Sequence, residues 1–232
     1  MEEILLSEKL EGKAANLMTV HIKWLGHASF QVKANGKSIY IDLEKKSPTY
    51  EKADLVLVTH SHYDHCDPSQ IKKVRKDNTT VIAPRDCSTK ISGDVKTLKP
   101  GEEAKIGGVK IKAVEAYNNK RFRSPGNPYH PKGLGVGYLI EIEDTIIYHA
   151  GDTDFIPEME ELGHVNVALL PSGDTYTMDN VDAAEAALRI KPEAVIPMHR
   201  WDTDPKEFKK RVAANSKIRV VLLQEGEEYQ VN

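Results

Sequence analysis

Short apolar runs recur along the chain, and most of them have the composition of β-strands. Residues 54–60, DLVLVTH, are apolar on both faces, as expected for a strand that is covered from two sides. Residues 21–32 and 37–43 flank the turn sequence ANGK and therefore predict a β-hairpin. Further runs rich in β-branched and aromatic residues predict strands at 104–116, 135–144 and 145–152.

Helices are fewer, and each is followed by a strand. The first begins with Asp67 and Pro68, a common helix start, and two more near the C-terminus follow from composition and spacing. The predicted helix–strand pairs are 67–76 with 79–85, 180–190 with 193–199, and 204–216 with 218–226. Together, the pattern indicates an α/β protein.

One long segment, residues 117–131, lacks any such pattern. Its sequence, YNNKRFRSPGNPYHP, contains three prolines and a glycine, so we expect a loop, and long loops in compact domains are often functional. Lys120, Arg121 and Arg123 lie in it and are candidates to receive an anionic substrate. The alternative is a charged loop face in contact with solvent, which is common for such runs.

Length and composition limit the possible classes. The chain has 232 residues, of which 40% are apolar and 29% charged, with a net charge of −3. We expect a single domain over residues 19–232, preceded by an N-terminal extension, residues 1–18. The mildly acidic net charge gives no excess of basic residues, so we expect neither nucleic acid nor an anionic membrane as a partner.

The expected compartment follows from the cysteine count and from the length of the apolar stretches. Cys66 and Cys87 are the only cysteines, so a disulfide framework is not expected and a reducing compartment fits. No apolar stretch approaches the ~18 residues of a membrane span. We therefore expect a cytoplasmic protein, whose oligomeric state, a homo-oligomer included, stays open.

The strongest chemical signal is VTHSHYDHCD, residues 58–67, directly after an apolar run. His60 and His62 are two apart, so in an extended segment they point to the same side and can hold one ion. Asp64 and His65 follow where the chain must bend, and offer ligands to a second position. A solvated turn is the alternative, but three of the chain's nine histidines within six positions favour a metal site.

The segment THSHYDH resembles the His-x-His-x-Asp-His signature of the metallo-β-lactamase superfamily. WLGHASF, YHAGDTD and VIPMH extend the resemblance to its UPF0173-like and L-ascorbate-6-phosphate-lactonase-like metal-dependent hydrolases, from about Val20 to the C-terminus. The resemblance implies a four-layer αβ/βα sandwich with a metal site at one edge, between two β-sheets.

The resemblance also implies metal ligands, which match this sequence position by position. Asp152 in AGDTD matches the carboxylate that bridges two metals, and His27 in GHASF matches a residue beside the ligands or in contact with substrate. A hydrogen-bonded histidine near a strand end is the alternative for His27. The other implied ligands are His60 and His62 for the first metal, and Asp64, His65 and His199 for the second.

The third histidine of the first site is missing from its usual place. In the superfamily it commonly follows an Ala-x-His pattern, but this chain has Asn118 there. His149 is three residues before Asp152 on one predicted strand, where the two side chains tend to opposite faces. His130 lies between Pro128 and Pro131, which restrict the backbone. We therefore predict His130 as the ligand; the alternatives are His149, Asn118 or solvent.

The expected activity is hydrolysis. Two divalent cations, with zinc the first choice and manganese or iron as alternatives, make hydroxide available near pH 7 and polarise a carbonyl or phosphoryl oxygen. The implied reaction is attack of a metal-bound hydroxide on an ester, lactone or phosphodiester of a small molecule, for which an anionic group is one option. Asp64 would bind metal and orient or deprotonate the nucleophile.

Two other functions fit the same residues. The first is a di-iron oxygen or nitric oxide reductase, but such proteins usually have glutamate where His62 stands, and a fused flavin domain for which this chain has no room. The second is a non-catalytic metal-binding protein, which an incomplete ligand set would favour.

Overall fold

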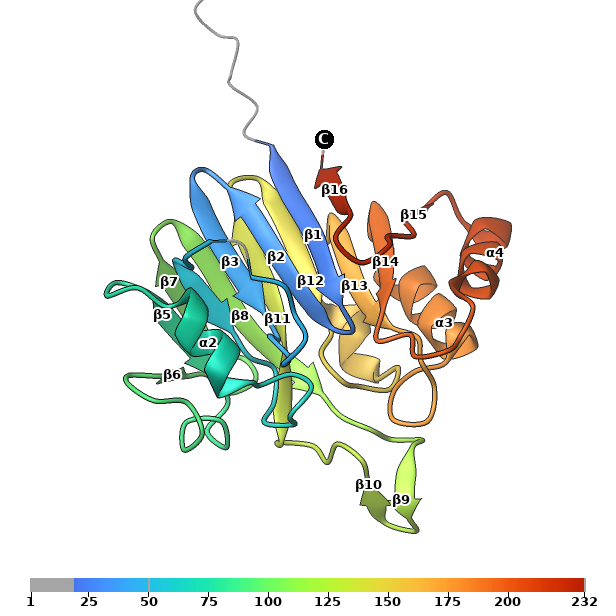
Figure 1. The fold of residues 1–232 in the computed structure, drawn as a ribbon. Coiled ribbons are helices and arrows are strands. Elements are labelled where there is room, and N and C mark those ends of the chain that lie inside the picture. The colour runs from blue at the N-terminus through green and yellow to red at the C-terminus, as the bar shows by residue number, and fades with distance from the viewer. Residues whose placement is uncertain (1–18, 50, 232) are drawn as a thin grey trace, which may run out of the picture.

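The computed structural model describes residues 19–49 and 51–231. The expected N-terminal extension, residues 1–18, lies outside these residues. Two seven-stranded sheets form the centre of the molecule (Figure 1). Among the described residues, no helix is both long and apolar enough to span a bilayer.

The first sheet contains the N-terminal strands and has β16, the last strand of the described residues, at one edge. Its order is β16-β1-β2-β3-β4-β5-β6, with antiparallel pairing from β16 to β3 and parallel pairing from β3 to β6. Its strands are β1 (Val20–Gly26), β2 (Ser29–Ala34), β3 (Lys37–Ile41), β4 (Leu55–Leu57), β5 (Thr80–Ala83), β6 (Lys96–Thr97) and β16 (Glu228–Val231).

The second sheet has the order β15-β14-β13-β12-β11-β8-β7, and its strands from β12 to β15 run parallel. Its strands are β7 (Glu103–Ile106), β8 (Val109–Ala116), β11 (Gly135–Ile142), β12 (Thr145–His149), β13 (Val167–Pro171), β14 (Ala194–Met198) and β15 (Arg219–Val220). A separate two-stranded ribbon, β9 (Phe122–Ser124) with β10 (Asn127–Pro128), projects from the body (Figure 1).

Helices cover the outer face of each sheet. The helix α2 (Pro68–Val74) lies on the first sheet, while α3 (Asn180–Ile190), α4 (Pro205–Asn215) and the 3₁₀ helix η1 (Pro157–Glu161) lie on the second (Figure 1). Asp67, Asp179 and Asp204 cap α2, α3 and α4, since each side chain accepts a backbone N–H of the first turn.

Successive residues of a central strand enter different cores. In β13, Val167 and Leu169 lie between the two sheets, whereas Ala168 and Leu170 pack beneath α3 and α4. This alternation explains why the central strands are apolar on both faces. The layers are therefore helix, sheet, sheet and helices, and the predicted four-layer αβ/βα sandwich is confirmed.

Several predicted elements have other boundaries in the structure. The hairpin around ANGK is confirmed, with Ala34 opposite Lys37, but residues 21–32 form two strands because the chain reverses at His27 and Ala28. Residues 104–116 are likewise split by a turn, at two glycines with positive φ. The predicted strand 218–226 shortens to β15, and the predicted loop 117–131 contains the β9–β10 ribbon.

The outer core provides a test of this layer arrangement. Phe208 of α4 is fully buried beneath the second sheet. Phe208→Ala should lower the free energy of unfolding by about 3–5 kcal/mol, because a large cavity forms. The measurement is chemical denaturation. Phe122→Ala is the matched control, since Phe122 is 42% exposed and its loss should change stability by less than about 0.5 kcal/mol. Equal losses in the two variants would contradict the packing.

Candidate metal centre

Eight side chains with metal-ligating atoms gather at one edge of the two sheets. They come from chain segments far apart in sequence: the β1–β2 turn, the segment after β4, the long loop 117–131, and the ends of β12 and β14. Within each of three overlapping groups, the ligating atoms lie within 4.8 Å of one another. The eight residues are His27, His60, His62, Asp64, His65, His130, Asp152 and His199.

The first group consists of His60, His62 and His130. His62 Nδ1 lies 3.1 Å from His60 Nε2 and 3.2 Å from His130 Nε2. Asn118 accepts hydrogen bonds from the backbone N–H of His130 at 2.8 Å and from its Nδ1 at 2.9 Å. This fixes the ring so that the Nε2 lone pair points toward the other two histidines. Asn118 thus holds His130 in place.

His149 lies elsewhere. Its Nε2 donates to Ala28 O at 2.9 Å, and its Nδ1 accepts from the Gly151 N–H at 3.2 Å. Its ring packs edge-on against Phe30 in the core between the sheets. Both ring nitrogens are therefore occupied by the backbone, and His149 belongs to none of the three groups.

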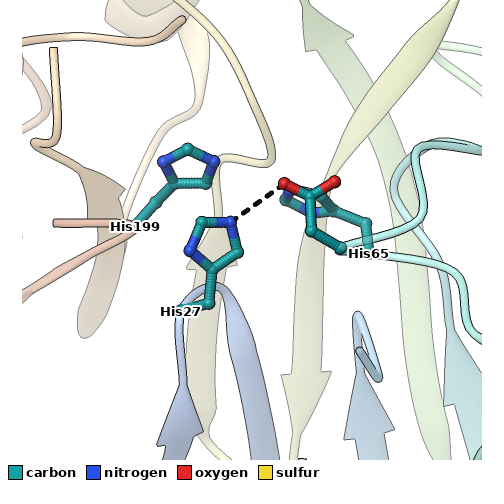
Figure 2. A group of neighbouring side chains, drawn as sticks. His27, His65 and His199 are labelled. Carbon is teal, nitrogen blue, oxygen red and sulfur yellow. Dashed lines mark hydrogen bonds and ion pairs between the residues drawn. The ribbon is translucent and has the colours of Figure 1, made fainter. Parts of the chain in front are cut away.

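The second group consists of His27, Asp64, His65 and His199. Figure 2 shows the three histidines pointing toward one another from separate segments. His27 Nε2 donates to Asp64 Oδ2 at 3.2 Å, and the rings of His27 and His199 lie 3.9 Å apart between centroids. The sequence indicated a residue beside the ligands at His27, but gave no sign that it lies within the group itself.

Asp42 is a buried residue that the sequence analysis missed. It accepts hydrogen bonds from the backbone N–H and hydroxyl of Thr59 at 2.7 and 2.6 Å, and from His65 Nδ1 at 2.8 Å. Asp42 therefore orients His65 so that Nε2 faces the centre. Its only sequence signal was an aspartate at the end of an apolar strand, YIDL.

Asp152 joins the two groups just described, since it forms the third group together with His60 and His65. Its Oδ2 is 3.2 Å from His199 Nε2, 3.3 Å from His130 Nε2 and 3.9 Å from His60 Nε2. Its Oδ1 is 3.3 Å from His65 Nε2. One carboxylate therefore reaches histidines of both groups, as a bridging ligand would.

The backbone around the centre adopts conformations that L-residues rarely use. His27, Asp42 and His199 all have φ of +48°, and each such residue costs of order 1 kcal/mol or more. Gly173 makes room for one of them, since a Cβ there would lie 2.0 Å from the carbonyl oxygen of His199. The fold thus maintains strain in order to present these side chains.

Four buried atoms at the centre indicate that its residues fit a metal. His65 Nε2, Asp152 Oδ1 and both ring nitrogens of His199 are buried without a hydrogen bond of good geometry. Leaving such an atom unsatisfied costs about 1–3 kcal/mol. A cation bound among them would accept a lone pair from His65 Nε2, from Asp152 Oδ1 and from one ring nitrogen of His199, so the donor set suits a divalent metal.

Comparisons with known proteins agree with this geometry. A family model described as a beta-lactamase superfamily domain matches residues 21–199. A UPF0173 metal-dependent hydrolase of Methanopyrus kandleri is 33% identical over 231 residues, covering 91% of this chain and all of the relative. The chain belongs to the UPF0173 metal-dependent hydrolases. This confirms the predicted family, within the metallo-β-lactamase superfamily, and the enzyme class.

Solved structures share the fold of this UPF0173 protein. A crystal structure from Parabacteroides distasonis superposes with a TM-score of 0.83 at 35% identity, covering 90% of this chain and 94% of its own. Igni18, a metallo hydrolase from Ignicoccus hospitalis, has a TM-score of 0.76 at 29% identity, covering 92% and 99% of the two chains. The predicted metallo-β-lactamase fold is therefore confirmed.

Burial and neighbouring charges together determine the protonation of the UPF0173 centre. It lowers the pKa of His60 well below the ordinary value and that of His130 to about 4, so both are neutral at pH 7 and able to bind metal. Burial would raise the pKa of Asp152, but His199 and His65 hold it well below its usual range. Burial would lower the pKa of His65, but Asp152 and Asp42 raise it well above 6.5.

The centre opens into a pocket of about 360 Å³. Two of the three cations proposed for substrate binding are already paired elsewhere. The Arg121 guanidinium contacts four aspartates, with Asp154 and Asp182 each at 2.8 Å, and Lys120 contacts Asp182 at 2.8 Å. Only Arg123 of the three lines the pocket. The other lining residues are His62, Tyr63, Asp64, Tyr129, His130, Asp152, Tyr176, His199 and Trp201.

The contact between Asp42 and His65 predicts a pH dependence of the metal-free protein. The folded-state pKa of His65 is raised, so its proton stabilises the fold below about pH 6.5, and this stability is lost as pH rises through the raised value. Asp42→Asn should lower the pKa of His65, as measured by an NMR titration of its imidazole. The stability difference between variant and wild type should be larger near pH 6 than in alkali. An unchanged His65 titration would refute the role of Asp42.

Proposed function

We propose that this UPF0173 protein is a dinuclear metal-dependent hydrolase of small molecules that carry an ester, lactone or phosphodiester bond. The observation that carries the proposal is Asp152, whose carboxylate lies within 3.3 Å of His130 on one side and of His65 and His199 on the other. A buried anion in contact with two histidine groups is suited to hold two cations a short distance apart.

The proposed ligands follow the two groups. His60, His62 and His130 would hold the first metal and Asp64, His65 and His199 the second, with Asp152 shared. Nitrogen and oxygen donors favour zinc as the first choice, with manganese or iron as alternatives. Divalent cations held there lower the pKa of a coordinated water toward ~7 and polarise a carbonyl or phosphoryl oxygen.

Asp64 is the proposed catalytic residue. Burial would raise its pKa, but the hydrogen bond from His27 and the charge of His65 lower it to about 2, so the carboxylate is ionised at neutral pH. Its Oδ2 accepts from His27, and the side chain lines the pocket. Such a carboxylate accepts a hydrogen bond from an attacking water and fixes its direction, but is too weak a base to keep the proton.

The expected compartment and substrate belong to the same proposal. Cys66 and Cys87 are both buried free thiols, which supports the expectation of a reducing compartment such as the cytoplasm. A substrate with a negative charge is supported by Arg123, which lines the pocket and has no carboxylate partner among the ion pairs of the described residues.

Metal content tests the dinuclear site. After reconstitution, the wild type should bind close to two equivalents of transition metal by elemental analysis. His130→Ala should retain about one, and Asp152→Ala should lose both, because its carboxylate serves both positions. His149→Ala is the matched control: it should keep two metals and lose about 2–3 kcal/mol of stability, because two buried hydrogen bonds are removed.

Two results would contradict this assignment. If His149→Ala lost one metal while His130→Ala kept two, the third ligand would be reversed. If the wild type bound only one equivalent at saturation, the site would be mononuclear.

Activity tests the hydrolase and the role of Asp64 together. We expect the reconstituted protein to cleave at least one substrate from a panel of generic esters, lactones and bis-p-nitrophenyl phosphate. Asp64→Asn should lower kcat by about 10²- to 10⁴-fold, with a change in stability of less than about 1 kcal/mol. Asp77→Asn, an exposed residue in the turn after α2, should leave both unchanged. Parallel losses of activity and stability in Asp64→Asn would indicate a structural role.

A further inference from the structure

Aromatic side chains from three separate segments form one wall of the pocket. Tyr129 follows β10, Tyr176 precedes α3, and Trp201 follows β14. The ring centroids of Tyr129 and Tyr176 lie 4.8 Å apart, and those of Tyr176 and Trp201 lie 6.2 Å apart. Trp201 also lies 5.6 Å from the ring of His199, so the wall leads directly to the proposed metal ligands.

The side chains of this wall are partly exposed to solvent, which is unfavourable for large apolar groups. Trp201 is 52% and Tyr176 39% exposed, and Tyr63 on the same pocket is 79% exposed. These three are among five large hydrophobic side chains that are exposed in the described part of the chain. Such a concentration at one pocket marks a surface that a ligand covers.

The backbone keeps Trp201 in this position at a cost. Its φ is +47°, in the left-handed region, which a bulky residue rarely adopts. A Cβ on Gly173 would lie 2.7 Å from Trp201 Cδ1, so the neighbouring loop packs closely against the indole. The Thr203 hydroxyl, which lies close to the carbonyl oxygens of Arg200 and Ser172, ties the two segments together. The exposed indole is therefore held by its surroundings.

Arg123 provides the complementary charge. It lies in β9, and its guanidinium carbon is 5.0 Å from the centroid of the Tyr129 ring, at the end of the wall. The neighbouring cations Lys120, Arg121 and Lys132 are paired with carboxylates at 2.7–2.8 Å. Arg123 has no such pair within the described residues and remains available to an anion in the pocket.

We propose that the substrate is a small planar anion, whose aromatic or unsaturated ring lies against Tyr129, Tyr176 and Trp201 while Arg123 binds its carboxylate or phosphate. The inference rests on the proposed function, because the bond to be cleaved then lies between this wall and the metal centre. Ring stacking selects the planar group, and the forked guanidinium selects an oxyanion. A pocket of about 360 Å³ limits the substrate to a small molecule.

Calorimetric titration with three probes tests this proposal without using turnover. The probes are 2-naphthoate, its neutral counterpart 2-naphthamide, and its saturated counterpart decahydro-2-naphthoate. The wild type should bind 2-naphthoate about tenfold more tightly than either of the others. Arg123→Gln should weaken 2-naphthoate about tenfold and leave 2-naphthamide within twofold.

Two further variants separate the wall from the charge. Trp201→Leu should weaken both planar probes about fivefold and leave decahydro-2-naphthoate nearly unchanged. Tyr176→Leu gives an independent measurement, should Trp201→Leu disturb His199. Arg211→Gln, on the exposed side of α4, is the matched control for Arg123→Gln and should bind every probe as the wild type does.

The outcomes distinguish this inference from the proposed function. If Arg123→Gln weakens 2-naphthamide as much as 2-naphthoate, Arg123 only packs on Tyr129 and the inference is wrong. If the wild type prefers the saturated probe or does not distinguish the three, the inference is also wrong. Metal content and hydrolysis of the generic panel are measured on the same samples. A wild type that selects the planar anion but hydrolyses nothing would overturn the proposed function alone.

Discussion

The burial of one carboxylate governs the rest of this structure. Asp152 lies almost entirely out of contact with solvent, where an isolated anion would be strongly disfavoured. The imidazoles of His65 and His199 offset that cost. Their Nε2 atoms lie 3.3 and 3.2 Å from the Asp152 carboxylate oxygens. Asp42 fixes His65, and a left-handed backbone fixes His199. The hydrogen bond from His65 to Asp42 and the unusual backbone at His199 thus both serve to compensate the negative charge of Asp152.

The residues around the pocket come mainly from strand ends and from the long loop 117–131. Asp152 and His199 follow β12 and β14, which both run parallel to β13 and end in buried residues. Arg123 and Tyr129 come from the long loop 117–131 and its ribbon. Most of the proposed ligands thus lie near sheet ends, with His130 the exception in the long loop, whereas Arg123 and Tyr129 lie on a segment that tolerates change. Substrate preference in such a fold can vary while the metal centre stays constant.

Local signals carried much of the prediction, and contacts between distant segments did not. The helices α2, α3 and α4 were predicted well because the start signal at Asp67 and Pro68, and the composition and spacing of the other two helices, are local properties of the sequence. The cluster from His60 to His65 was visible for the same reason. The place of His27 within the second group depends on a turn that brings it to Asp64, 37 residues away. The prediction that Arg121 is available to substrate is wrong because its acidic partners, such as Asp182, lie far along the chain and cannot be recognised from the local sequence. The aromatic wall assembles from three segments and has no sequence signature.

The pairing of β16 with β1 ties the two ends of the described chain, with Val20 opposite Val231. The same closing segment bonds to Trp24 beside the His27 turn, through Glu227 O and the Gly226 N–H. Contacts separated by some 200 residues form slowly, because loop closure costs entropy before any packing is gained. During synthesis, the edge of β1 therefore remains without its neighbour until β16 has left the ribosome. The His27 turn acquires its final support only then, so the histidine centre matures as a late event in folding.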